Sequence, residues 1–231
     1  MQAAMPAKSA SGWPIIAMRV PVNVELTPRA YDVTTMIGTF LRTPVTRVVE
    51  PTARALLARK VSANQVTIVG ALGTIGISLL CFTRGQLFVG TLAMLIFIFS
   101  DLVDGTMARI SGTTSKFGAF LDSTSDRIVD AALIGSVTYF LYRESDPLHV
   151  VAWFALAGGF LVSYVKARAE ASGFTCEGGF AERAERTIIL LVSTGFAGLG
   201  IPYILAIGIW TLAIASFLTA AFRIHQVWKQ R

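Results

Sequence analysis

Four aspartates lie in or beside long apolar runs near the middle of the chain. Asp101 and Asp104 follow the run LAMLIFIFS, and the run AALIGSVTYFL begins soon after Asp122 and Asp126. A carboxylate in a hydrocarbon environment is costly and persists only where it has a function or a partner. Carboxylates without neighbouring cysteine or histidine favour hard cations such as Mg²⁺, Mn²⁺ or Ca²⁺. Two divalent ions shared by four acids would suit phosphoryl chemistry.

The short connection between the two acid-bearing segments predicts that these acids meet. Asp104 lies nine residues before Thr113 and Asp122 nine after it, while Asp101 and Asp126 lie twelve before and thirteen after it. In an antiparallel helical hairpin, equal distance from the turn means equal depth, here just below one membrane face. Each helix then carries its acids and small residues on one side: Asp101, Asp104, Gly105 and Ala108 on the first, and Gly118, Asp122 and Asp126 on the second.

The composition indicates an integral membrane protein that is entirely α-helical. Of the 231 residues, 54% are apolar and only 15% are charged, whereas about a quarter are charged in ordinary soluble domains. Apolar stretches near the length needed to cross the hydrocarbon core follow one another with short polar breaks. We therefore predict six transmembrane helices, over residues 65–83, 86–108, 117–142, 147–170, 186–201 and 203–225. The fifth is short, and its Gly195, Gly198 and Gly200 suggest close helix packing.

The N-terminal part divides into two segments before the first predicted span. Residues 1–34 show no sustained periodicity and are expected to form a flexible tail, so the membrane domain would comprise residues 35–231. Within residues 35–60, apolar side chains recur at helical spacing and are interspersed with arginine and lysine. This pattern predicts an amphipathic juxtamembrane helix on an anionic membrane surface.

The distribution of basic residues predicts the orientation in the membrane. With the N-terminus in the cytoplasm, seventeen lysines and arginines fall on the cytoplasmic side and only Arg84 and Arg143 on the other. The protein is thus expected in the cell membrane, multi-pass, with both termini and the acidic site cytoplasmic. The net charge of +6 resides in these loops, which argues against a nucleic-acid partner.

The residues alone leave other uses of the acids open. Buried ion pairs with Arg109, Lys116 and Arg127 are one, although these cations are too few for four acids. A cation or proton pathway, as in an ion-coupled transporter, is another, but it would place acids near the membrane midplane. A non-catalytic scaffold would need none of them. Arg109, one turn beyond Gly105, adds a guanidinium fork suited to a phosphate.

The acidic stretch matches, at every position, the signature of the CDP-alcohol phosphotransferase family: Asp101-x2-Asp104-Gly105-x2-Ala108-Arg109-x8-Gly118-x3-Asp122-x3-Asp126. The chain resembles this family over about residues 35–228. The resemblance implies a six-helix enzyme that transfers a phosphoalcohol from a CDP-linked donor to a hydroxyl acceptor and releases CMP. It also implies a homodimer.

The resemblance further assigns roles to individual residues. Asp101, Asp104 and Asp122 would bind two Mg²⁺ ions, with Mn²⁺ as an alternative, and Asp126 would be a further ligand and the general base. The donor, expected to be CDP-diacylglycerol, would contact residues of the signature, the first span and the hairpin loop: Asn64, Gln65, Val66, Thr67, Gly105, Ala108, Arg109 and Ser115. Helix capping is a second, compatible use of Ser62 and Asn64. We expect direct displacement without a covalent intermediate.

The acceptor is predicted from basic residues outside the acidic stretch. The segments SYVKARAEASG and GGFAERAERTIILL resemble those of actinobacterial members of the family that join CDP-diacylglycerol to inositol 1-phosphate. A basic pocket beside the base suits an acceptor that carries a phosphate, although charge alone does not separate inositol 1-phosphate from glycerol 3-phosphate. The residues expected to bind the acceptor phosphate are Arg127, Lys166, Arg168, Arg183 and Arg186.

Overall fold

The computed structural model describes residues 49–112 and 115–231 of the chain. The tail predicted over 1–34 and the larger part of the surface helix predicted over 35–60 lie outside these residues. The part of that helix within them, residues 49–58, is helical. It buries Val49 and Ala53 against Val103 and Met107. This short helix therefore packs on the protein through its apolar side.

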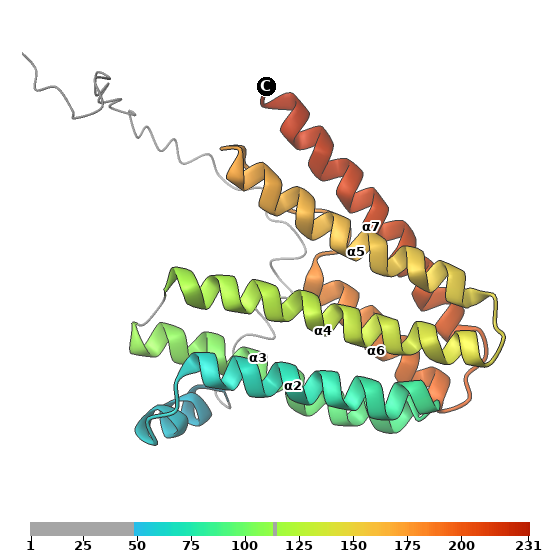
Figure 1. Cartoon of the computed structure of the whole chain (residues 1–231), viewed down its shortest axis with the longest axis horizontal. Helices are drawn as coiled ribbons and strands as arrows, with labels where there is room; N and C mark the ends of the chain where they lie inside the picture. The colour runs from blue at the N-terminus through green and yellow to red at the C-terminus, as the bar shows by residue number, and fades with distance from the viewer. Residues whose placement is uncertain (1–48, 113–114) are drawn as a thin grey trace, which may run out of the picture. The chain divides into compact units, whose positions relative to one another are not determined.

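The remaining described residues form six long helices and one turn of 3₁₀-helix (Figure 1). Each predicted span coincides with one helix to within about four residues at either end. The elements are α2 Ala63–Cys81, η1 Phe82–Arg84, α3 Leu87–Ser111, α4 Lys116–Arg143, α5 Leu148–Ala171, α6 Arg183–Gly198 and α7 Ile204–Lys229.

Local sequence signals explain where the helices nearest the acids begin and end. Ser62 and Gln65 form a reciprocal capping box at the start of α2, which satisfies two backbone donors that a helix start leaves unpaired. Helix α3 ends at Gly112, which adopts a left-handed conformation (φ 63°) that glycine tolerates without strain. Ser115 then caps α4, its hydroxyl accepting a 2.9 Å hydrogen bond from the Gly118 amide.

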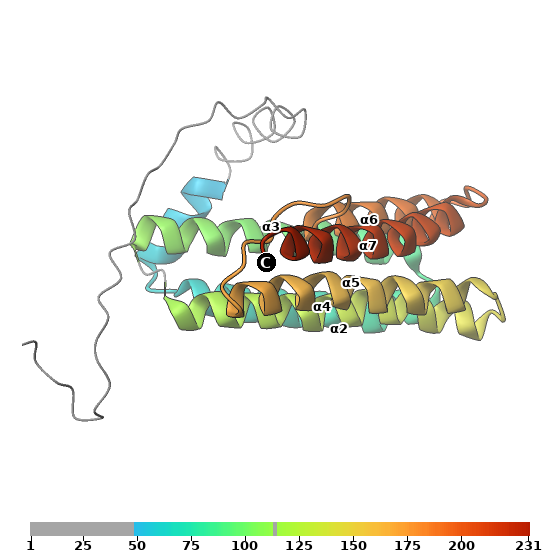
Figure 2. The same cartoon turned by 90° about the horizontal axis from the view of Figure 1, so that it is seen from above.

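The six helices form a closed ring in which each packs against two neighbours. Around the ring the order is α2, α3, α6, α7, α5, α4 and back to α2. Figure 2 shows the ring as two layers, with α3, α6 and α7 on one side and α2, α4 and α5 on the other. The two acid-bearing helices, α3 and α4, are consecutive in sequence but have α2 between them. Helices α3 and α4 therefore do not form a tightly packed pair, and the hairpin encloses a space.

Four of the described helical segments are long and apolar enough to cross a membrane: Ala63–Arg84, Leu87–Ser111, Leu148–Ala171 and Ile204–Lys229. Helix α4 contains Asp122, Asp126, Arg127 and Asp130, which lower its mean hydropathy. Helix α6 has only 16 residues, in agreement with the short fifth span expected from the sequence.

Small residues bring α6 close to α3. A Cβ atom at Gly198 would overlap the backbone of Phe88, and one at Gly195 would lie 3.1 Å from Thr91. The predicted close packing is confirmed for these two glycines. Glycine at position 200 is explained by backbone conformation rather than by packing. Gly200 follows the helix in a left-handed turn (φ 86°) and has open space beside it.

Candidate functional site

A cavity of about 430 Å³ lies inside the ring, between α2, α3, α4 and α6. Its polar lining includes Thr67, Asp104, Asp126 and Arg183. The rest of the wall is largely apolar, with Met94 among the lining side chains. One acid from each helix of the predicted hairpin therefore reaches the same enclosed space.

Asp104 is the most enclosed of the described acids. Its residue is 6% exposed, and one carboxylate oxygen accepts a 2.5 Å hydrogen bond from the Thr67 hydroxyl of α2. A hydroxyl donor stabilises the charged form of a carboxylate and fixes its orientation. Helix α2 thus positions the carboxylate on α3.

The described carboxylates do not by themselves form a metal cage. Asp122 is exposed on α4, and the side chain of Asp101 lies outside the described set. Among the side chains that are described, no three acids, histidines or cysteines lie together as a metal-binding group. Asp104 and Asp126 supply only hard oxygen donors facing one cavity, which fits Mg²⁺ or Mn²⁺ and does not fit zinc.

The residues expected to bind the donor gather where α2 and α4 begin. A Cβ at Gly118 would lie 3.4 Å from the Asn64 side-chain oxygen and 3.2 Å from the Ser115 hydroxyl. Capping accounts for two predicted contacts, since Gln65 accepts from the Ser62 amide and Ser115 caps α4. Ser62, rather than Asn64, is the capping residue of α2.

On α3, the small residues of the signature leave open space. A Cβ at Gly105 would meet no atom within 4 Å, so packing within the protein does not require glycine there. Arg109 is exposed, and its guanidinium donates a 2.9 Å hydrogen bond to Thr106 one turn earlier. Ala108, which lies between Gly105 and Arg109 in the sequence, is half-buried. This face can admit a ligand close to the helix backbone.

Asp126 is the point where the acidic and basic groups meet. Its carboxylate forms a 2.7 Å ion pair with Arg183 of α6 and lies 3.8 Å from Arg127, the next residue of α4. Asp126 is only 15% exposed at its side chain, so these charges interact with less screening than surface pairs. The predicted base and two predicted phosphate-binding arginines are therefore in one site.

Asp130 is a fifth acid that sequence reasoning missed. Its carboxylate lies 3.7 Å from Arg127, 3.8 Å from Arg183 and 3.7 Å from Arg186, and its side chain is 16% exposed. The signal was present, because Asp130 continues the i, i+4 row of Asp122 and Asp126 by one more turn. It is the carboxylate around which three arginines from α4 and α6 converge. We call Arg127, Arg183 and Arg186 the arginine cluster.

Lys166 and Arg168, unlike the arginine cluster, form no ion pair with Asp126 or Asp130 in the described part of the chain. Lys166 forms a 3.9 Å ion pair with Glu170 one turn further along α5. Arg168 is exposed in the last turn of the same helix. Both lie at the end of the ring that carries the cluster, since α5 ends where α6 begins.

Replacing Asp130 by asparagine is expected to lower the thermal midpoint in detergent by roughly 5–10 °C. The variant removes the negative charge that the arginine cluster shares, and close guanidinium groups then repel one another. Added inorganic phosphate should restore part of the loss by supplying an anion. Glu144→Gln removes a charge from an exposed pair with Arg143 and should change the midpoint little. Equal midpoints for the two variants would show that Asp130 does not hold the cluster.

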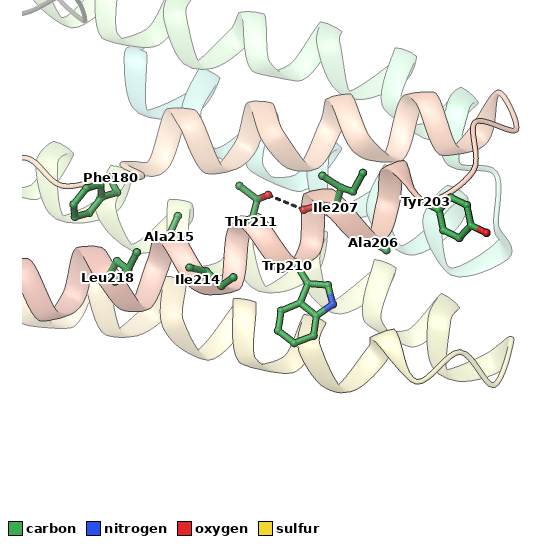
Figure 3. Close-up of a pocket in the computed structure, with 9 residues that line it drawn as sticks. All are labelled: Phe180, Tyr203, Ala206, Ile207, Trp210, Thr211, Ile214, Ala215 and Leu218. Carbon is green, nitrogen blue, oxygen red and sulfur yellow. Dashed lines mark hydrogen bonds between the residues drawn. The ribbon is translucent and has the colours of Figure 1, made fainter.

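A larger depression lies elsewhere, on the outer face of α7 (Figure 3). It is lined by apolar side chains such as Ile207, Trp210, Ile214 and Leu218, together with Phe180. Its lining contains no acid, lysine, arginine or histidine. Such a surface suits contact with lipid chains and cannot perform phosphoryl chemistry.

Comparison with known proteins identifies the family. A family model described as CDP-alcohol phosphatidyltransferase matches residues 60–221. The chain is 42% identical over 192 residues to phosphatidylinositol phosphate synthase of Corynebacterium glutamicum, covering 82% of this chain and 88% of the relative. The enzyme of that name from Streptomyces avermitilis is 43% identical over 201 residues, covering 83% and 82%.

Solved structures agree with the sequence relatives. The crystal structure of Mycobacterium tuberculosis phosphatidylinositol phosphate synthase with CDP-DAG bound aligns with a TM-score of 0.76 at 39% identity, covering 79% of this chain and 94% of that one. The same enzyme in complex with manganese and citrate aligns with a TM-score of 0.74, covering 78% and 88%. The match of signature, sequence and fold shows that this chain belongs to the CDP-alcohol phosphatidyltransferase family.

Proposed function

We propose that this protein transfers the phosphatidyl group of CDP-diacylglycerol to a hydroxyl of inositol 1-phosphate, giving phosphatidylinositol phosphate and CMP. The observation that carries the proposal is the ion pair between Asp126 and Arg183 at the cavity. It joins a carboxylate of the family signature to the arginine cluster. The relatives above, which bear the name of this activity, support the same acceptor.

The donor would bind on the side of the cavity formed by α2 and α3, where Asp104 lies. Asn64, Gln65, Val66, Thr67, Gly105, Ala108, Arg109 and Ser115 would contact its cytidine diphosphate end. Open space beside Gly105 lets a phosphate approach α3, and Arg109 offers a guanidinium fork at the next turn. The apolar wall of the cavity suits the lipid end of the same molecule.

Asp101, Asp104, Asp122 and Asp126 would hold two Mg²⁺ ions, with Mn²⁺ as the alternative. When bound, such ions neutralise the pyrophosphate of the donor and stabilise the departing CMP. The chain's own contribution is to hold the carboxylates in place, as Thr67 does for Asp104. Asp122 would join these ligands from its exposed position on α4.

The arginine cluster would receive the acceptor's phosphate, together with Lys166 and Arg168 from the end of α5. A phosphate monoester carries nearly two negative charges at neutral pH. Arginine forks bind such groups with paired, charge-assisted hydrogen bonds. Because Arg183 touches Asp126, an acceptor held by its phosphate presents its hydroxyls near that carboxylate.

Asp126 would act as the general base. As the acceptor oxygen forms a bond to the phosphorus bearing the lipid, its proton passes to the Asp126 carboxylate, and the bond from phosphorus to the CMP oxygen breaks. A carboxylate is a weak base, so the proton moves only as the hydroxyl becomes acidic in the transition state. No covalent intermediate is needed.

We further propose that all six helices cross the membrane, with both termini and the site on the cytoplasmic side, and that the protein forms a homodimer. The segregation of charge supports the orientation. The arginine cluster, Arg109, Lys116 and Lys229 share one end of the ring, whereas Arg84 and Arg143 are at the other. There, Arg143 donates to the Thr83 carbonyl at 3.3 Å.

The experiment is CMP release from CDP-diacylglycerol by the purified protein in lipid nanodiscs. We expect release with inositol 1-phosphate in the presence of Mg²⁺ or Mn²⁺, loss of at least about 100-fold on chelation, and recovery when the metal is restored. Glycerol 3-phosphate, inositol and serine serve as comparison acceptors. Release with none of the four would contradict the proposed function, and preference for glycerol 3-phosphate would assign a different acceptor.

A further inference from the structure

The loop between α5 and α6 directly precedes Arg183 of the arginine cluster and is hydrogen-bonded to α7. Arg223 of α7 donates from Nε to the Gly178 carbonyl at 3.0 Å and from Nη1 to the Val162 carbonyl at 3.0 Å. The Gln230 amide bonds Thr175 at the far end of the loop. The contacts to Gly178 and Thr175 are made to the loop backbone, whereas Val162 belongs to α5. Helix α7 therefore determines the path of the loop.

Thr219 contacts the last part of this loop, close to the start of α6. Its hydroxyl, on a residue with 0% exposure, accepts hydrogen bonds of 3.0 Å from the amides of both Phe180 and Ala181. It donates in turn to the Ala215 carbonyl at 2.7 Å. One side-chain oxygen therefore accepts from two consecutive amides just before α6 begins, and the hydrogen bond to Ala181 is buried.

The backbone at this point is shaped around Thr219. Gly179 adopts φ 142°, and a Cβ there would overlap the methyl group of Thr219. This close approach and the unusual φ both require glycine. The loop has room for the threonine side chain only because residue 179 has none.

The same stretch holds Arg186. Its Nη1 donates a 3.2 Å hydrogen bond to the Ala181 carbonyl, and its Nη2 faces Asp130. The side chain of Arg186 is 6% exposed, against 28% for Arg127 and 32% for Arg183. It is the most enclosed member of the arginine cluster, and the Ala181 carbonyl is the backbone group that anchors it.

From this chain of contacts we propose that Thr219 is a positioning residue for the acceptor phosphate, acting through Ala181 on Arg186. It touches no reacting atom. The proposal rests on the proposed function in one respect, namely that the arginine cluster receives the acceptor. Thr219 lies on α7, which contributes nothing to the cavity lining, so its effect on acceptor binding would be indirect.

The test compares Thr219→Val with Thr219→Ser. Valine keeps the shape but removes the acceptor of the Phe180 and Ala181 amides, the second of them buried. This loss should shift the loop and raise the KM for inositol 1-phosphate about 10-fold. The KM for CDP-diacylglycerol should stay within about 2-fold, because the donor contacts do not pass through α7. Serine keeps the hydroxyl and should restore an acceptor KM close to that of the unmodified protein.

Thr138→Val is the matched control. Thr138 is 2% exposed, and its hydroxyl bonds only the Ile134 carbonyl of its own helix among the described residues. The same substitution there should leave both KM values unchanged. If Thr219→Val purifies poorly, Thr219→Ala against Thr219→Ser isolates the hydroxyl equally well. Equal acceptor KM values in the valine, alanine and serine variants would overturn the proposal.

A binding measurement separates this inference from the proposed function. Thermal stabilisation by inositol 1-phosphate, and separately by inorganic phosphate, reports occupation of the arginine cluster without turnover. We expect Thr219→Val to need about 10-fold more of either ligand than Thr219→Ser. If the unmodified protein binds these ligands but transfers the phosphatidyl group to no acceptor, the proposed function is contradicted. The binding comparison still tests the positioning role of Thr219 in that case. Identical ligand dependence in the two variants would remove its positioning role.

Discussion

Replacing Asp126 by asparagine is expected to lower the rate of CMP release by roughly 10³-fold. Asparagine matches the shape of aspartate but cannot take the proton of the acceptor hydroxyl. Donor binding should change by only a few-fold, since the remaining aspartates and the donor contacts on α2 and α3 are intact. Rates of CMP release, together with thermal stabilisation by CDP-diacylglycerol, measure the two effects separately.

Asp146→Asn is a suitable control for that experiment. Asp146 lies in the connection between α4 and α5, at the opposite end of the ring, where its carboxylate accepts a 2.9 Å hydrogen bond from the Leu148 amide. Its substitution should leave the rate within about 2-fold, because it is remote from the site. A near-normal rate for Asp126→Asn would show that another group removes the proton.

Replacing Arg186 by alanine should raise the KM for inositol 1-phosphate by roughly 10- to 100-fold. The reason is its enclosure: its guanidinium donates to the Ala181 carbonyl and faces Asp130, so its loss removes the most enclosed cation of the cluster. Arg186→Lys keeps the charge but loses the fork, and we expect an intermediate effect. The donor KM, measured in the same preparations, should remain within about 3-fold because the donor is bound elsewhere.

Arg143→Ala provides the matched control for Arg186. Arg143 is an arginine at the far end of the ring with a half-exposed side chain. Its loss should change neither KM. Acceptor dependence that is the same in Arg186→Ala and in the unmodified protein would exclude Arg186 from the acceptor site.

Much of the site was predictable from the sequence, because it depends on spacing along single helices. The interval between Asp101 and Asp104, and the row from Gly118 to Asp126, determine which side of each helix is acidic. The short connection between the two helices brings their acids to one depth. Asp104 and Asp126 accordingly line one cavity. Helix positions followed from the lengths of the apolar runs.

The lateral order of the helices could not be derived in the same way. Helices that face lipid on one side and protein on the other are apolar nearly all round, so their periodicity does not identify neighbours. The sequence suggested a hairpin whose two helices face each other directly. The structure places α2 between them, and this insertion puts the Thr67 hydroxyl against Asp104.

Other residues were missed because their roles depend on contacts between distant segments. Asp130 acquires its role from Arg183 and Arg186, more than fifty residues later in the chain. Thr219 acquires its role from the loop before α6. A lone threonine in an apolar helix usually bonds its own backbone, as Thr138 does, so nothing in the local pattern singled it out.

We propose that the arginine cluster and Asp126 together select a phosphorylated inositol as the acceptor. Product analysis with equimolar inositol 1-phosphate, glycerol 3-phosphate, inositol and serine, in nanodiscs with CDP-diacylglycerol and Mg²⁺, measures this selection. We predict that mass spectrometry will find phosphatidylinositol phosphate as the dominant product, formed in step with CMP. A dominant product carrying glycerol phosphate, unphosphorylated inositol or serine would show that this site does not select a phosphorylated inositol.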